Sequence, residues 1–116
     1  MTSHILGIEI GGTKLQLAIG TPQGEIVAVR RGRVDNKLGG EGIREWLERQ
    51  IPDFIEAEKH RVEHICAIGC GFGGPVNSQG GRVLQSVQIE GWGDFPLREW
   101  LEKTFSLSAI VANDSN

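Results

Sequence analysis

The chain has 116 residues, of which 12 are Lys or Arg and 15 are Asp or Glu, so its formal net charge is -3. A chain of this length can build one hydrophobic core, and we expect a single domain. The net negative charge and the absence of a long Lys/Arg run argue against nucleic-acid and membrane partners. No apolar run approaches the roughly 20 residues of a membrane span, and the N-terminus lacks the features of a signal peptide. We therefore expect a cytoplasmic protein.

The segment from Ile5 to Thr21 consists of two short apolar runs separated by the loop Gly11-Gly12-Thr13-Lys14. Glycines can adopt positive φ and let a ligand approach the backbone, while Thr13 adds a hydroxyl group and Lys14 a cation. These features predict a phosphate-binding loop, with a plain hairpin turn as the alternative. The loop differs from a nucleotide-binding P-loop in residue order, and the alternating residues that follow it predict a strand rather than a helix.

The next elements are a third strand and a helix. Residues Glu25 to Val34 continue the pattern as a strand, which makes an antiparallel meander with the first two. We expect a loop from Asp35 to Gly42. From Ile43 to Ile55 the apolar residues follow helical spacing, so we expect an amphipathic helix that Pro52 kinks or restarts.

A fourth strand is expected from His64 to Gly71, and it contains both cysteines of the chain. In an extended strand the Cα atoms of Cys66 and Cys70 lie about 13 Å apart, too far for a disulfide. We expect two buried free thiols. The nearby His60 and His64 suggest a metal site, but an extended segment cannot bring these four side chains to one zinc ion.

The glycines at positions 69, 71 and 74 match a dinucleotide-binding fingerprint. That fingerprint needs a helix directly after it, which Pro75 and the following glycines prevent, so we predict a loop whose backbone approaches a ligand. Further on we expect a short strand or extended arm from Arg82 to Ile89. A helix with the buried stripe Leu97, Trp100, Leu101 and Phe105 follows, capped by Asp94 with Pro96 in its first turn.

A fifth strand is predicted from Ser108 to Ala112, followed by Asn113-Asp114-Ser115-Asn116. The order of three strands, helix, strand, arm, helix and strand predicts an α/β fold with a mixed five-stranded sheet and flanking helices.

Four segments together resemble the ROK family of sugar kinases, which includes bacterial glucokinases and has the ribonuclease H-like, actin-like ATPase fold. The segments are Gly11-Gly12-Thr13-Lys14, Gly71-Phe72-Gly73-Gly74-Pro75-Val76, Gly91-Trp92 and the terminal Asn113-Asp114-Ser115-Asn116. They occur in the family's order and spacing, and the resemblance covers essentially all 116 residues.

The resemblance implies ATP-dependent phosphorylation of a hexose hydroxyl with Asp114 as the general base. It assigns Glu9, Gly11, Gly12, Thr13 and Lys14 to the phosphates of ATP, with Mg²⁺ held through Glu9. It assigns sugar binding to Gly74, Pro75, Val76, Gln88, Asn113 and Asp114. The family has Asp at the position of Glu9 and usually Asn at that of Gln88, so each of these side chains is one methylene longer here.

The resemblance also implies that residues 1–116 form an N-terminal domain. The family's second domain, with its structural zinc site and most of the adenine site, has no counterpart in this chain. We expect a homodimer, and no kinase turnover by the 116 residues alone. A kinase is favoured over the family's repressors because no winged-helix segment precedes the first strand. A non-catalytic sugar-binding sensor is the alternative function.

Overall fold

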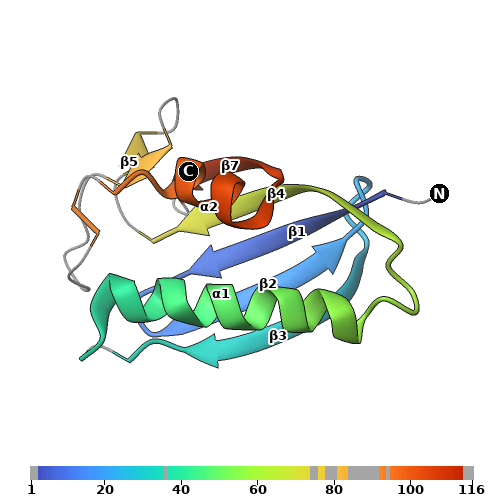
Figure 1. The fold of residues 1–116 in the computed structure, drawn as a ribbon, viewed down its shortest axis with the longest axis horizontal. Coiled ribbons are helices and arrows are strands. Elements are labelled where there is room, and N and C mark those ends of the chain that lie inside the picture. Colours follow the sequence, from blue (N-terminus) through green and yellow to red (C-terminus); the bar gives the residue numbers. More distant parts are fainter. Residues whose placement is uncertain are drawn as a thin grey trace.

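The computed structural model describes residues 3–35, 37–73, 76–77, 81–83, 92–93 and 95–113. The elements in chain order are β1 (Ser3–Ile10), β2 (Lys14–Gly20), β3 (Ile26–Arg33), α1 (Gly39–Ala57), β4 (His64–Phe72), β5 (Val76–Asn77), β6 (Arg82–Val83), α2 (Leu97–Phe105) and β7 (Ser108–Asn113). Figure 1 shows the main strands side by side with α1 and α2 packed across them. Neither helix in these ranges has the length and apolar character needed to cross a bilayer.

The main sheet has the strand order β3-β2-β1-β4-β7. Strands β1, β2 and β3 form the predicted antiparallel meander, whereas β4 runs parallel to β1 and β7 runs parallel to β4. This arrangement confirms the prediction of a mixed five-stranded sheet. The short strands β5 and β6 pair with each other in a separate ribbon.

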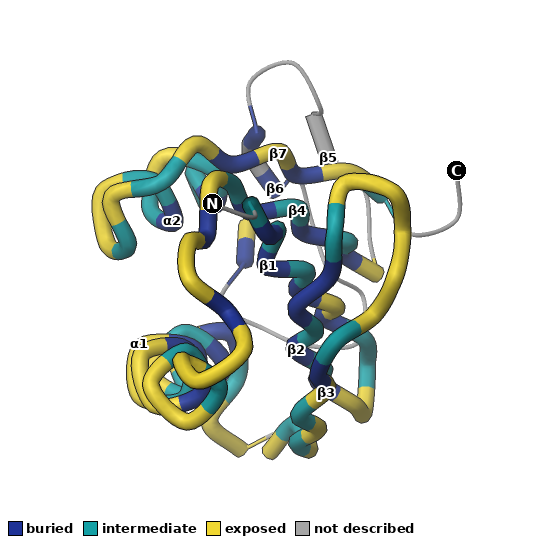
Figure 2. The backbone as a smooth tube through the Cα atoms, turned by 90° about the vertical axis from the view of Figure 1, so that its right-hand side faces the viewer, coloured by how far each residue is buried: buried dark blue, intermediate teal, exposed yellow. Residues whose placement is uncertain are grey.

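One face of the sheet carries the core, because apolar side chains alternate with small or polar ones along each strand. Figure 2 shows α1 and α2 on the same side of the sheet. The buried residues of this side include Leu6, Ile8, Leu17, Ile68 and Val111, and those of the helices include Leu47 and Leu101. We call the opposite side of the sheet, which carries Glu9, Gln16 and Arg31, the outer face.

Helix α1 starts four residues earlier than predicted, at Gly39 rather than Ile43. The loop predicted from Asp35 to Gly42 was therefore wrong in its second half, where the helix has already begun. The glycines there favour a loop, because each glycine costs a helix about 1 kcal/mol relative to alanine. The backbone N–H of Gly42 donates to the carbonyl of Leu38, and a Cβ atom at Gly42 would lie 2.3 Å from the Cβ of Leu38. Glycine therefore allows the Leu38 side chain to lie over the first turn.

Pro52 lies inside α1, which continues without interruption to Ala57. The helix therefore does not restart at this residue. The helix stripe was predicted correctly, since Ile43, Leu47, Ile51 and Phe54 are buried. In α2, the N-cap residue is Pro96 and no side chain caps the helix. Pro96 therefore precedes the first turn, and the expected cap Asp94 lies outside the described residues.

The prediction that both cysteines are buried was wrong for Cys66, which is exposed, while Cys70 is buried. The reason is a β-bulge, because His4 pairs with Ile65 while the next residue, Ile5, pairs with Ala67. Cys66 is the extra residue, and the bulge reverses the alternation between the two faces. Ile65 and Ile68 are thus both buried despite their odd separation.

Candidate functional site

The predicted phosphate loop is the turn between β1 and β2. The backbone N–H of Gly11 donates to the carbonyl of Lys14 over 3.0 Å, and the N–H of Val34 donates to the carbonyl of Thr13 over 3.0 Å. The N–H groups of Gly12 and Thr13 have no acceptor within the described ranges. Two backbone donors and a lysine at one turn are positively polarised, which suits an anion.

The glycines of this loop do not use the left-handed conformation that the sequence allows. The described glycines with positive φ are Gly24, Gly39 and Gly81. What Gly11 provides is space, because a Cβ atom there would lie 3.3 Å from the carbonyl oxygen of Lys14. A side chain at this position would therefore press against the hydrogen bond that closes the turn.

The ends of three parallel strands bring distant parts of the chain to the phosphate loop. Ile10 pairs with Phe72, and Phe72 pairs with Asn113. The N–H of Gly73 extends this pairing by donating to the carbonyl of Ile10 over 2.8 Å. With about 4.8 Å between strands, Asn113 lies about 10 Å from Ile10. Ligands of α/β sheets commonly bind beyond such carboxyl ends.

The other predicted sugar-site residues are placed only in part. Val76 is described through its backbone, which pairs with Val83 in the β5–β6 ribbon. Gly74, Pro75, Gln88 and Asp114 lie outside the described residues. Of the arm predicted from Arg82 to Ile89, the first two residues form β6 and the remainder is outside these ranges. Asp114 directly follows Asn113, the last residue of β7.

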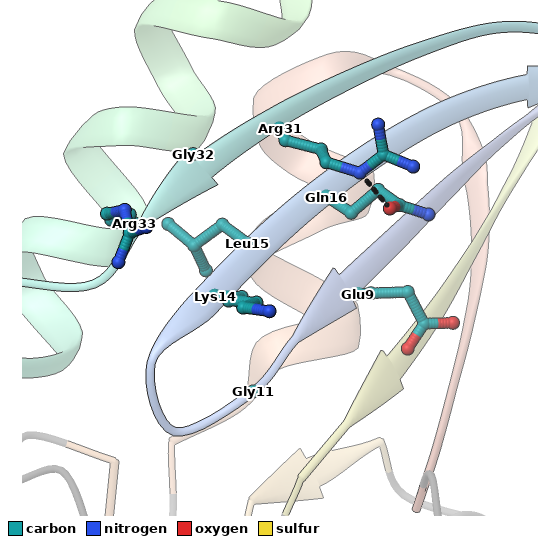
Figure 3. A pocket seen from close by; sticks show the side chains of 8 residues that line it. All are labelled: Glu9, Gly11, Lys14, Leu15, Gln16, Arg31, Gly32 and Arg33. Carbon is teal, nitrogen blue, oxygen red and sulfur yellow. Dashed lines mark hydrogen bonds between the residues drawn. The ribbon is translucent and has the colours of Figure 1, made fainter.

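A hollow of about 550 Å³ lies on the outer face beside the loop. Glu9, Lys14, Gln16, Arg31 and Arg33 contribute charged or polar side chains to its lining. Figure 3 shows the Lys14 side chain between Glu9 and Arg33, and the Nε of Arg31 donating to Oε1 of Gln16 over 3.1 Å. An exposed carboxylate beside a phosphate loop suits Mg²⁺, which proteins bind through one or two carboxylates together with substrate phosphates.

The place of Arg31 and Arg33 beside this loop was not predicted from the sequence. The signal was present in the alternation of β3, whose residues 29, 31 and 33 are exposed while Ala28 is buried. To place the two arginines beside the loop, the β2–β3 register is also needed, because it sets Arg33 opposite Lys14 and Arg31 opposite Gln16.

A second feature missed from the sequence is an aromatic cluster near the end of β4. The ring of Trp92 is 1% exposed and meets Phe72 and Phe95 edge-to-face, at centroid distances of 5.1 and 5.6 Å. The Arg44 guanidinium of α1 lies 4.9 Å from the Trp92 ring and 4.0 Å from the Phe95 ring. Burial lowers the pKa of Arg44, while Glu41 and Glu48 act in the opposite direction. Arg44 thus connects α1 to the segment that contains Trp92.

Relatives of known activity match nearly the whole chain. A glucokinase from Halalkalibacterium halodurans is 31% identical over 111 residues, which cover 96% of this chain and 33% of the relative. A β-glucoside kinase from Listeria monocytogenes is 30% identical over 112 residues, with 97% and 35% coverage. The chain therefore spans about a third of the length of these relatives.

Solved structures match the fold. A ROK family glucokinase from Streptomyces griseus, in complex with glucose and AMPPNP, superposes with a TM-score of 0.78 and 26% identity over 97% of this chain and 34% of its own. A ROK family transcriptional regulator, described as a homologue of the E. coli MLC protein, has a TM-score of 0.88 and 22% identity over 98% and 28%.

These neighbours confirm the ribonuclease H-like, actin-like ATPase fold expected from the sequence. The relatives named above are sugar kinases, and they cover almost every residue of the chain. Residues 5–116 match the sequence pattern of the ROK family. The chain therefore belongs to the ROK family.

Proposed function

We propose that this chain is the N-terminal domain of an ATP-dependent hexose kinase. The observation that supports this most directly is the register across β1, β4 and β7, which aligns Ile10, Phe72 and Asn113. The phosphate loop follows the first of these residues, and Asp114 follows the last. A phosphoryl donor and a hydroxyl acceptor bound at this one edge would lie within reach of each other.

In the proposed mechanism the protein acts mainly by alignment, because phosphoryl transfer has a loose transition state and needs little covalent help. The Gly11–Lys14 loop holds the phosphates of ATP. Asn113 binds the sugar, with Gly74, Pro75, Val76 and Gln88 as further contacts. Asp114 orients the acceptor hydroxyl and accepts its proton late in the transfer. Mg²⁺, held through Glu9, would neutralise charge on the phosphates.

The proposal includes a second domain, because alignment of two substrates in a water-poor cleft requires two walls. We expect the 116 residues alone to bind sugar weakly and to show no turnover. The glucokinase of Streptomyces griseus contains glucose and AMPPNP, which supports ATP and a hexose as the substrates here. The named relatives act on different sugars, so the choice among glucose and other hexoses is left to the assay.

The test is sugar-dependent ADP production by the complete protein, measured with glucose, mannose, fructose and N-acetylated amino sugars. We expect the Asp114→Asn variant to lose about 10²-fold or more in turnover, since general-base catalysis is typically this large. Sugar affinity should change little. The charge-matched control is Asp53→Asn, which alters an exposed carboxylate on α1. Near-normal turnover of Asp114→Asn would refute its role.

A non-catalytic sugar sensor is the second candidate. It is supported by the close superposition on a ROK family transcriptional regulator, although 22% identity extends only to the fold. A sensor would bind sugar without consuming ATP. Saturable sugar binding with no ADP formation by the complete protein would therefore favour the sensor over the kinase.

A further inference from the structure

Three cationic side chains gather on the outer face next to the phosphate loop. Lys14 pairs with Arg33, and Gln16 pairs with Arg31, so all four side chains point to the same face of the β2–β3 ribbon. Glu9 joins them from β1, where it pairs with Gln16. Residues two apart on a strand are separated by about 7 Å. The cations therefore extend from the loop along β3 for more than the width of one phosphate.

The charge of this region opposes that of the whole chain. The hollow is lined by three cations and one carboxylate, a net charge of +2, whereas the chain carries -3. Like charges placed opposite each other on neighbouring strands destabilise a sheet, and Lys14 and Arg33 are such a pair. A local cost of this kind is typical of a functional site.

Four other cations in the described ranges are neutralised by a carboxylate, although none is found for Lys37 and Arg49. Arg30, the neighbour of Arg31 on the other face of β3, lies 2.7 Å from Asp53. Lys59, Arg61 and Lys103 each have a carboxylate within 2.7 Å. No salt bridge to Lys14, Arg31 or Arg33 is found among the described residues, and these three cations lie together on one face of the β2–β3 ribbon.

The geometry of the two arginine side chains favours phosphate as the anion that balances the cations of the outer face. A guanidinium group presents N–H donors in a fixed fork that matches two oxygens of a phosphate. The bond from Nε of Arg31 to Gln16 fixes the side chain and leaves both terminal nitrogens to donate elsewhere. Gly32, between the two arginines, adds bare backbone to the lining.

We propose that Lys14, Arg31 and Arg33 bind a chain of phosphate groups that extends from the phosphate loop along β3. This inference rests on the proposed function, because the loop has to hold the end of the same phosphate chain. The chain of phosphates can come from a nucleoside triphosphate or from inorganic polyphosphate, and both present the same oxygens to the arginines.

The experiment measures binding of inorganic tripolyphosphate and of ATP to the purified protein by calorimetry at low ionic strength. The variants are Arg31→Gln, Arg33→Gln and the double variant. The matched control is Arg61→Gln, which removes an exposed arginine three residues before β4, at the opposite edge of the sheet. Each arginine should contribute about fivefold in affinity, as an exposed charge pair does, and the pair about 25-fold.

Loss of tripolyphosphate and ATP affinity in the variants, with less than twofold change in the control, supports a site for nucleotide phosphates. Loss for tripolyphosphate alone supports a site for inorganic phosphate chains. Removing Arg33 should leave the midpoint of urea unfolding unchanged or higher, since it removes a like-charge pair. A purely structural role for Arg33 would lower that midpoint.

The inference is overturned if the variants bind both ligands as tightly as the unchanged protein, or if the control loses as much affinity. It is also overturned if the unchanged protein binds neither ligand. The kinase proposal fails separately, through the turnover of Asp114→Asn. If the arginine variants bind both ligands normally and the complete protein is an active kinase, only the phosphate-chain site is rejected.

Discussion

Replacing Gly32 with alanine should weaken the packing of α1 against β3. A Cβ atom at Gly32 would lie 2.4 Å from Cζ2 and 2.7 Å from Cε2 of Trp46. Carbon atoms in protein cores pack at about 3.5 to 4.0 Å, so the indole has to retreat by about 1 Å or more. Its neighbours on α1, Ile43 and Leu47, are 2% and 0% exposed and restrict that movement.

The expected cost follows from two opposing effects. Adding a methyl group to a filled space costs about 1–3 kcal/mol. Replacing glycine with alanine also stabilises the folded state by about 0.5–1 kcal/mol, because the unfolded alanine variant has less conformational freedom to lose on folding. We therefore expect Gly32→Ala to lower the free energy of unfolding by about 1 kcal/mol and the melting temperature by about 5 °C.

The assay is urea unfolding followed by circular dichroism, with Gly69→Ala as the matched control. Gly69 is also a strand glycine, but a Cβ atom there meets nothing within 4 Å. The control should match or exceed the unchanged protein in stability. In a Trp46→Leu background, Gly32→Ala should cost less than it does alone. Equal stability of Gly32→Ala and Gly69→Ala would refute the reasoning.

Three further changes test other parts of the structure. Gly12→Val should raise the KM for ATP of the complete protein by placing a branched side chain in the phosphate loop, and unchanged ATP saturation would count against that loop. Arg44→Ala should lower the free energy of unfolding in urea by about 1–2 kcal/mol, because it removes the contacts with Trp92 and Phe95. Arg44→Met should recover the part of this loss that comes from packing. Leu47→Ala should cost about 2–5 kcal/mol, and a loss below about 1 kcal/mol would contradict its place in the core.

The sequence by itself determined most of the elements of the main sheet and the helix stripe of α1. Alternation at Leu15, Leu17 and Ile19 predicted a strand, and the spacing from Ile43 to Ile55 predicted a helix stripe, because each pattern reports a local period. The glycine loop at residues 11–14 was recognisable for the same reason, since its chemistry lies in consecutive residues. Its role with phosphate, like that of Asp114 with sugar, stays a prediction.

Tertiary structure decided what depends on pairing between distant segments. Only the order β1-β4-β7 brings Asn113 to the edge where the phosphate loop lies. Only the β2–β3 register sets Arg33 opposite Lys14. The bulge that exposes Cys66 arises from the pairing of β4 with β1. Local periodicity has no information on strand order or register, since both are set by which faces pack together across the whole sheet.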